Sequence, residues 1–175
     1  MSGGRGEDSR RLFFACWPDA NLRAEIIKRR RLIEGLSPRR VPDHNLHLTL
    51  LFLGNQPAAC VPSLLAAMDQ VTTTAFELTL DRFGWFPGAR VAWLGGHAPA
   101  AAQALVSRLS ALCEQLGLQV DRRPFRPHVT LFRKVSGRPE LPDPEMLVWP
   151  VREFALIESI PSRPYQVLRI QPFTL

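Results

Sequence analysis

Apolar positions in the N-terminal half of the chain alternate between strand-like and helix-like spacing. The short run RLFFACW at 11–17 predicts a strand, and Asp19 is placed to cap a helix over 20–34. The largely apolar NLHLTLLFLG at 45–54 predicts a buried strand, and apolar residues at helical spacing over 58–71 predict a second helix. The fold therefore opens in the order strand, helix, strand, helix.

The C-terminal half begins with a similar mixture of strands and helix. The segments 76–83 and 90–95 flank the turn formers GWFPG, and this arrangement predicts a hairpin. An alanine- and leucine-rich stretch then predicts a helix over 99–116, and PHVTLFRK at 127–134 predicts a strand. Both halves of the chain thus combine helices with strands.

The rest of the chain predicts a long loop, two final strands and a loose N-terminal end. Four prolines recur in the loop, and the segments 151–160 and 165–175 that follow predict strands. These prolines are Pro139, Pro142, Pro144 and Pro150. Residues 1–10 are small and polar and predict a flexible tail, which leaves 11–175 as a single domain of ordinary size.

One short phrase occurs twice. HLTL at 47–50 returns as HVTL at 128–131, 81 residues later, each time within a strand-like apolar run. With four histidines and seven threonines in 175 residues, chance predicts about 0.16 HxT matches. The repetition predicts an α+β fold of two similar lobes, related by an approximate twofold axis and facing each other across a groove.

Each phrase places its histidine and its threonine on one face of a strand, because side chains alternate along extended backbone. His47 and Thr49 project together while the flanking leucines turn towards the core, and the same holds for His128 and Thr130. Burying these four polar groups in separate places is unfavourable, whereas one wet groove satisfies them all. The pattern therefore predicts one shared site.

The side chains of this site suit phosphodiester chemistry. Imidazole has an unperturbed pKa of about 6.5, so one histidine can act as a base and the other as an acid near neutral pH. Threonine hydroxyls can donate hydrogen bonds to the non-bridging oxygens of a phosphate. This arrangement requires no metal or other cofactor, and the residues alone do not indicate which imidazole is the acid.

Four further residues are candidates for contacts with a nucleotide. Arg133 lies on the opposite strand face from His128 by simple alternation, so it can bind phosphate only if a bulge turns it, and otherwise it pairs with a structural carboxylate. Phe125 and Trp85 are either stacking platforms for a nucleobase or core residues, and Tyr165 leaves the same choice.

A metal site is the alternative explanation for the first histidine motif. His44 and His47 stand three residues apart, which sends their side chains to opposite faces of a strand, and neither an HExxH motif nor a carboxylate cluster accompanies them. The sequence therefore disfavours metal catalysis.

The net charge of +6 favours a polyanionic partner, for which nucleic acid is the natural candidate. Basic residues cluster as KRRR at 28–31 and around Arg122, Arg123 and Arg126, although the first cluster can equally be the solvated face of a helix. No segment has the roughly 18 apolar residues of a membrane span, and three widely spaced cysteines suit free thiols in a reducing compartment. We therefore expect a cytoplasmic protein without membrane attachment.

Three segments together resemble a known family. RLFFACWP at the start, NLHLTLLFLG, and RPFRPHVTLFRK are similar to the two-histidine phosphoesterase superfamily, and most closely to its bacterial RNA 2′,3′-cyclic phosphodiesterases, also called 2′-5′ RNA ligases. The resemblance covers about 11–175. It implies a duplicated bilobal fold in which two antiparallel sheets line a central cleft, with the helices on the outside.

The resemblance also implies an activity and the roles of four residues. The reaction is metal-independent hydrolysis of a terminal 2′,3′-cyclic phosphate of RNA to a 2′-phosphate, together with reversible 2′-5′ joining of RNA ends. His47 is then the proton donor, His128 the proton acceptor, and Thr49 and Thr130 hold the phosphate. Two other functions stay open: a module that binds RNA ends without turnover, and a phosphodiesterase of small cyclic nucleotides. No obligate protein partner is indicated.

Overall fold

The computed structural model describes residues 8–174. Most of the predicted N-terminal tail, residues 1–7, lies outside the described residues, while Ser9 and Arg10 already belong to the first strand. The strands are β1 (Ser9–Cys16), β2 (Arg39–Arg40), β3 (Leu48–Pro57), β4 (Phe76–Leu80), β5 (Arg82–Phe86), β6 (Val91–Gly95), β7 (His128–Arg133), β8 (Leu147–Val151), β9 (Glu153–Ser159) and β10 (Gln166–Pro172). The helices are α1 (Ala20–Arg30), α2 (Val61–Met68) and α3 (Ala100–Gln115), with 3₁₀ turns at Arg31–Ile33, Asp43–Asn45 and Ala58–Cys60.

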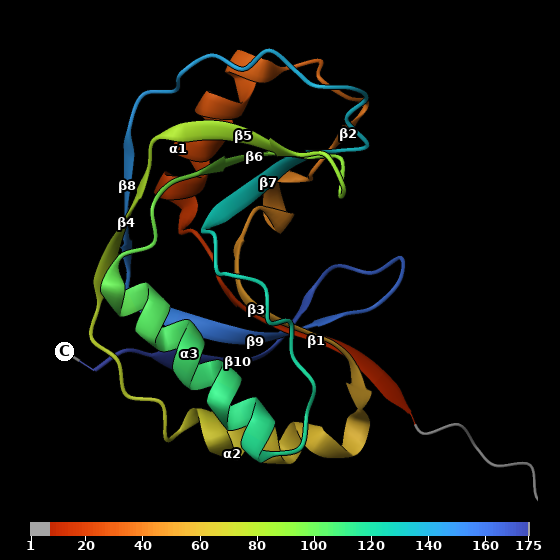
Figure 1. Cartoon of the computed structure of the whole chain (residues 1–175), viewed down its shortest axis with the longest axis vertical. Coiled ribbons are helices and arrows are strands. Elements are labelled where there is room, and N and C mark those ends of the chain that lie inside the picture. The colour runs from red at the N-terminus through yellow and green to blue at the C-terminus, as the bar shows by residue number, and fades with distance from the viewer. Residues whose placement is uncertain (1–7, 175) are drawn as a thin grey trace, which may run out of the picture.

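The main sheet consists of two antiparallel halves joined at one place. Its strand order is β10-β9-β1-β3-β7-β6-β5, with β2 also paired to β7. Between β3 and β7 the register contains a single residue pair, Leu48 with Val129. We call β10-β9-β1-β3 with α2 and α3 the first lobe, and β7-β6-β5 with β2 and α1 the second lobe (Figure 1). The expected α+β fold with two antiparallel sheets is confirmed.

The two lobes do not correspond to the two halves of the sequence. Helix α1, from the N-terminal half, lies with the second lobe, whereas α3, β9 and β10, from the C-terminal half, complete the first lobe (Figure 1). The chain therefore crosses between the lobes several times. This exchange ties the lobes together although their sheets share only one residue pair.

The prediction of a hairpin between 76–83 and 90–95 is wrong about which strands pair. Strand β5 pairs with β6, from Arg82 opposite Gly95 to Phe86 opposite Val91. Strand β4 pairs instead with β8, which lies in the stretch expected to be a proline-rich loop. Pro150 sits within β8 opposite Glu77, a position that proline tolerates because β8 has no second partner strand within the described residues.

Helix α1 begins and ends on specific side-chain contacts. The carboxylate of Asp19 accepts a hydrogen bond of 2.8 Å from the Leu22 amide, as the sequence predicts for its cap. At the other end Arg29 and Arg30 are buried, with exposed fractions of 5% and 2%, and their guanidinium groups donate to backbone carbonyls of neighbouring segments. The KRRR cluster is therefore only partly a solvated face, and half of it holds the fold together. Within residues 8–174 no helix combines the length and apolarity needed to cross a membrane.

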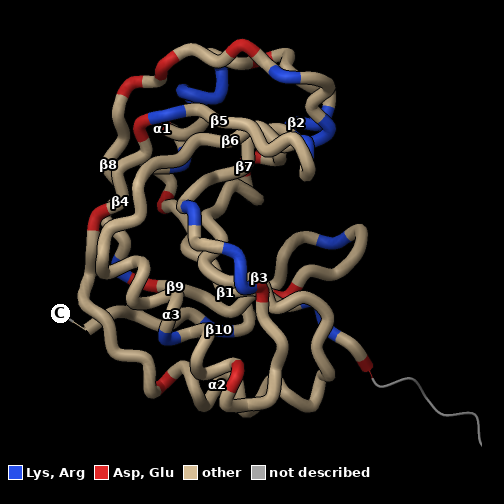
Figure 2. The backbone as a smooth tube through the Cα atoms, in the orientation of Figure 1, with Lys and Arg blue, Asp and Glu red and all other residues tan. Residues whose placement is uncertain are grey.

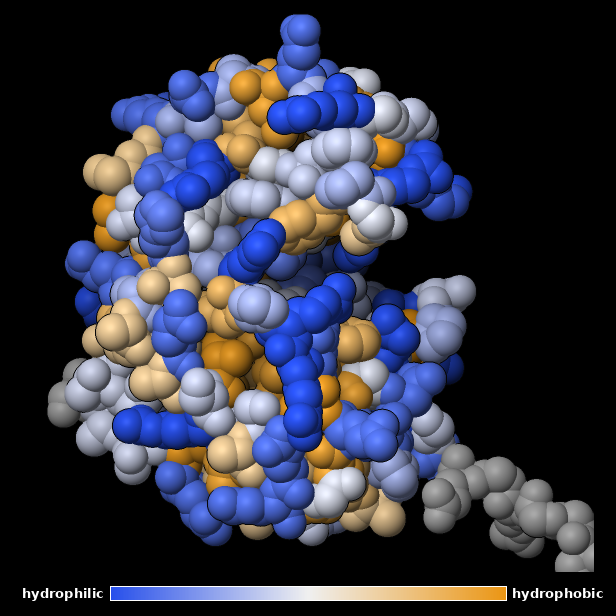
Figure 3. Space-filling view, viewed as in Figure 1, coloured by the Kyte–Doolittle hydropathy of each residue, from blue (hydrophilic) through white to orange (hydrophobic). Residues whose placement is uncertain are grey.

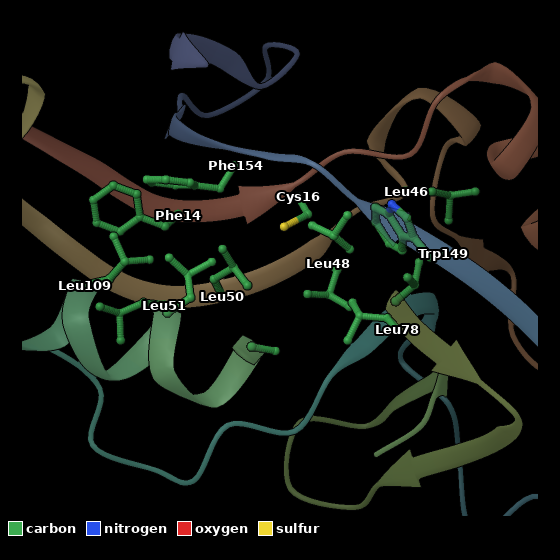
Figure 4. Packing of buried hydrophobic residues seen from close by; sticks show 14 of the residues in the cluster. Phe14, Cys16, Leu46, Leu48, Leu50, Leu51, Leu78, Leu109, Trp149 and Phe154 are labelled. Atoms are coloured by element: carbon green, nitrogen blue, oxygen red, sulfur yellow. The ribbon is translucent and has the colours of Figure 1, made fainter. Parts of the chain in front are cut away.

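The hydrophobic core fixes the two strands that carry the HxT phrases. Leu48 and Leu50 of β3 are buried, as is Leu46 just before it, and Val129 and Leu131 are buried in β7. Figure 4 shows how Leu48 and Leu50 pack among side chains from α3, β4 and β8. Each fully buried leucine contributes about 1.5–3 kcal/mol. Because the alternate residues are anchored in this way, the histidines and threonines between them have to face the opposite side.

Candidate active site

The two HxT phrases meet at the junction of the lobes. Leu48 and Val129, the middle residues of the phrases, are direct partners in the antiparallel register. The histidine and the threonine on either side of this pair lie, in each phrase, on the face opposite the buried leucine and valine. The molecular surface is hollowed between the two lobes (Figure 3).

Both histidines are oriented by a hydrogen bond from the ring to a backbone carbonyl two residues earlier in the chain. The Nδ1 atom of His47 lies 2.7 Å from the carbonyl oxygen of Asn45, and Nδ1 of His128 lies 2.6 Å from that of Arg126. A carbonyl can only accept, so Nδ1 carries the hydrogen in each ring. In the neutral ring Nε2 is then the basic atom, and Nε2 of His47 lies 3.1 Å from the hydroxyl oxygen of Thr49.

His47 is enclosed by aromatic rings of the first lobe. The ring of Trp17 stacks on it with centroids 4.8 Å apart and planes 14° apart. Phe13 and Tyr165 pack against it at 5.2 and 5.4 Å. The pKa of His47 is lowered to about 4, mainly because these rings bury it. The hydrogen bond to the Asn45 carbonyl opposes this shift, and the charges of Arg133 and His128 add to it.

His128 has a corresponding aromatic surround in the second lobe. Phe86 meets it edge to face at 5.1 Å, and the Trp93 ring lies at 5.9 Å. Burial again lowers the pKa of this imidazole, opposed by the hydrogen bond to the Arg126 carbonyl. Both imidazoles are therefore predominantly neutral at pH 7 in the unliganded protein.

A β-bulge in β7 determines on which face of the strand Arg133 lies. Thr130 pairs with Trp93 and Phe132 pairs with Ala92, so one residue of β7 between them has no partner of its own. Leu131 and Phe132 are both buried, and Arg133, next in the chain, is exposed. The expectation from simple alternation is therefore wrong, because the bulge reverses the faces. The effect of the Arg133 charge on the pKa of His47 places this arginine within electrostatic reach of the site.

The two aromatic candidates for base stacking have surroundings typical of core residues. Trp85 and Phe125 are partly buried and pack against the main core. In β5 it is the next residue, Phe86, that meets His128. The rings that do surround the histidines were missed or left undecided by sequence reasoning: Trp17, Phe86, Trp93 and Tyr165.

Two glycines make room for one of these rings. A Cβ atom on Gly84 would lie 2.1 Å from the Trp93 ring, and one on Gly95 would lie 2.8 Å from it. The side chain of Trp93 thus lies over Gly84 of the neighbouring strand and Gly95 of its own strand, next to His128. Glycines at 84 and 95 on either side of a strand tryptophan are the signal in the sequence that could have revealed this ring.

The other two histidines stay outside the motif pair. His44 is exposed in the 3₁₀ turn before β3, where its carbonyl accepts a hydrogen bond of 3.2 Å from Trp17, and His97 is exposed in the segment before α3. Within residues 8–174, histidine, cysteine, aspartate and glutamate side chains form no group of three that could hold a metal ion.

A protein-family model matches most of the chain. The model described as the 2′-5′ RNA ligase superfamily matches residues 18–159, which include both HxT phrases. The chain belongs to the 2′-5′ RNA ligase superfamily. The family resemblance of the sequence is thereby confirmed.

Members of this superfamily with curated names are close in sequence and length. A protein of Thermus thermophilus named RNA 2′,3′-cyclic phosphodiesterase is 34% identical over 163 residues, covering 85% of this chain and 81% of the relative. The Escherichia coli protein of the same name is 35% identical over 155 residues, with 87% and 88% covered. The expected enzyme class, a phosphoric diester hydrolase, agrees with these names.

A solved structure shows the same architecture. The crystal structure of E. coli LigT complexed with 3′-AMP superimposes with a TM-score of 0.88 at 33% identity, covering 96% of this chain and all of that chain. The duplicated, bilobal fold implied by the family resemblance is therefore confirmed.

Basic side chains of this superfamily member gather around the hollow between its lobes. Figure 2 shows basic positions, all of them arginines, along the segment between α3 and β7, which passes close to the junction of the lobes. Arg122 and Arg123 of that segment are exposed and pair with Glu114 and Asp121, respectively. At the far end of β7, Arg133 is joined by Arg39 of β2, which is its register partner.

Proposed function

We propose that the protein is an RNA 2′,3′-cyclic phosphodiesterase that opens a terminal cyclic phosphate to a 2′-phosphate. The observation that carries this proposal is the pair of imidazoles at one strand junction, each with Nδ1 anchored to a carbonyl and each beside a threonine. An acid and a base on opposite sides of one phosphorus atom are what in-line hydrolysis needs. The names of the relatives from T. thermophilus and E. coli support the same reaction.

The reaction is one displacement at phosphorus. Nε2 of His128 takes a proton from water as the water oxygen forms its bond to phosphorus. The bond from phosphorus to the 3′ oxygen breaks, and Nε2–H of His47 delivers a proton to that oxygen. The product carries a 2′-phosphate and a free 3′-hydroxyl, and a proton exchange with solvent restores the two rings. No metal or cofactor takes part in this scheme.

The pKa values support the proposed direction of proton flow. The pKa of His47 is lowered to about 4, so its protonated form is a strong acid for an imidazole. The pKa of His128 is lowered as well, and its Nδ1–H bond to the Arg126 carbonyl leaves a neutral Nε2 ready to act as base. An anionic cyclic phosphate beside His47 raises the pKa of that ring again, so binding of the substrate favours the protonated acid.

The phosphate is held by hydroxyl and guanidinium groups. Thr49 and Thr130 flank the two imidazoles and donate to the non-bridging oxygens, where negative charge grows in the transition state. Arg133, turned by the β7 bulge, adds a positive charge on the same side. The oxygen of a 5′-hydroxyl from a second RNA can replace water, and a 2′-5′ linkage then forms by the same displacement.

We place this activity in the cytoplasm. Cys16, Cys60 and Cys113 are all free thiols in the structure, and such thiols persist in a reducing compartment. RNA fragments with cyclic phosphate ends are the partners that the net charge of +6 favours.

The decisive experiment is an analysis of products from short RNAs that end in a 2′,3′-cyclic phosphate. We expect a 2′-phosphate as the product, at an undiminished rate in excess chelator. A 3′-phosphate would contradict the assignment of the leaving oxygen. Loss of activity in chelator with recovery on adding a divalent metal would contradict the two-histidine mechanism.

The same assay separates the other two functions. A module that only binds RNA ends would give no turnover at any enzyme concentration. An enzyme of small cyclic nucleotides would act on RNA no better than on a mononucleotide, and its substrate affinity would not depend on salt.

A further inference from the structure

The concave face of the first lobe carries a ladder of side chains that leads away from His47. Strand β1 is paired with β3 on one side and with β9 on the other, so residues of the three strands align in rows. Every second residue of β1 belongs to the face that meets His47. The rows on this face are Ala155–Ala15–Thr49, Ile157–Phe13–Phe52 and Ser159–Arg11–Asn55.

The three rows differ in chemical character. The row nearest the histidine consists of small side chains, and the next is apolar, with the Phe13 and Phe52 rings stacked at 6.4 Å. The last row, Ser159–Arg11–Asn55, is polar, and we call it the outer row. Its arginine is exposed, and the guanidinium carbon lies 4.7 Å from the centroid of the Phe52 ring. The aromatic ring therefore supports one face of the guanidinium and leaves its hydrogen-bonding edge available.

The outer row also lines a groove. A hollow of about 820 Å³ is bordered by Arg11, Asn55 and Ser159 and extends to the first residues of β1 and the end of β9. Two carboxylates, Asp8 and Glu158, border it as well, and Glu158 pairs with Arg10 at 3.7 Å. Arg11 forms no ion pair within residues 8–174, so its charge is available to a ligand in the groove.

Spacing indicates which part of an RNA would meet this row. Residues two apart on a strand are about 6.5–7 Å apart, so the outer row lies about 13 Å beyond Thr49. The guanidinium of Arg11, however, reaches back over the ring of Phe52 in the middle row, and that row lies only about 6.5–7 Å from Thr49. Neighbouring phosphates of an extended RNA strand are separated by about one such row, so the phosphodiester next to a cyclic phosphate held between the HxT phrases comes within reach of Arg11.

We propose that the outer row binds the first phosphodiester on the 5′ side of the terminal nucleotide. Arg11 donates hydrogen bonds and charge to its non-bridging oxygens, while Asn55 and Ser159 supply an amide and a hydroxyl donor. This subsite rests on the proposed function, since it is defined relative to a cyclic phosphate held by the histidines. It makes the protein selective for oligonucleotides over cyclic mononucleotides.

The test compares two substrates that differ only in this phosphodiester. Adenosine 2′,3′-cyclic phosphate lacks it, and the adenylyl-(3′,5′)-adenosine dinucleotide ending in the same cyclic phosphate has it. We expect Arg11→Ala to lower kcat/KM for the dinucleotide about tenfold or more, as for loss of a charged hydrogen bond, and to leave the mononucleotide unchanged. Arg11→Lys should restore only part of the lost kcat/KM, because lysine lacks the planar guanidinium group that can donate two parallel hydrogen bonds. Arg31→Ala, which removes an exposed arginine at the end of α1, should change neither substrate.

Salt dependence supplies a second readout. The slope of log kcat/KM against log salt for the dinucleotide should become less steep by roughly 0.7 in Arg11→Ala, as expected for one phosphate contact fewer on a single strand. Equal effects on both substrates, or none on either, would overturn the subsite while leaving the phosphodiesterase in place. If the wild-type protein opened neither substrate, the proposed function itself would fail.

Discussion

Acidification should destabilise the protein through His47. The pKa of this ring is about 4 in the folded protein and about 6.5 in an unfolded chain, so the unfolded state binds more protons between these values. The stabilisation is fully present above pH 6.5 and is lost as the pH falls towards 4. At pH 5 the loss from this single group is about 2 kcal/mol of unfolding free energy. Because the ring is only partly buried, solvent screening makes this an upper value.

The assay is urea unfolding at several pH values from 7.5 to 5 for the wild type and two variants. His47→Gln removes the titrating group, so its unfolding free energy should fall by about 2 kcal/mol less over this range than that of the wild type. His97→Gln, at an exposed histidine, should follow the wild type. Carboxylates with a lowered pKa, such as Asp43 and Asp121, titrate below this window. Parallel curves for His47→Gln and the wild type would refute the view that aromatic burial suppresses the His47 charge.

Three further outcomes follow from the site and its supports. The pH optimum of kcat/KM should lie below 6.5, because the pKa values of both motif histidines are lowered, and an optimum above 7.5 would contradict these shifts. Gly84→Ala should cost about 1–3 kcal/mol in chemical unfolding and reduce turnover, since its Cβ would overlap the Trp93 ring, whereas Gly88→Ala, with open space around it, should do neither. Arg30→Met should lower kcat more than it raises KM, because the buried guanidinium holds Asp43 in the turn before β3, and an unchanged kcat would show that this turn needs no such anchor.

Local patterns in the sequence predicted the parts of the fold that depend on neighbouring residues. The Asp19 cap, the two HxT strands and the long helix α3 follow from capping, alternation and helical spacing, and all are present. Long-range pairing was not predictable in this way. Nothing in the spacing of β4 indicates that its partner is β8, 67 residues or more away in the chain, in a segment whose proline suggests a loop. Local patterns also do not indicate that α1 joins the second lobe and α3 the first.

The residues of the candidate site also fall into those that local patterns predict and those that depend on long-range pairing. His47, Thr49, His128 and Thr130 were predicted together because alternation on a strand determines their face. The position of Arg133 depends on a bulge, whose presence is set by pairing with β6. The aromatic surrounds were unpredictable for the same reason, since Trp17 and Tyr165 approach His47 from segments 30 and more than 100 residues away.

The central claim, that two histidines form one catalytic unit, is tested most directly by single and double substitution. His47→Ala and His128→Ala should each lower kcat for an RNA cyclic phosphate by roughly 100-fold or more, while His97→Ala keeps full activity. The double variant should be little slower than the slower single variant, because residues that act as a unit are not additive. Wild-type turnover by either single variant, or losses that multiply in the double variant, would contradict the shared site.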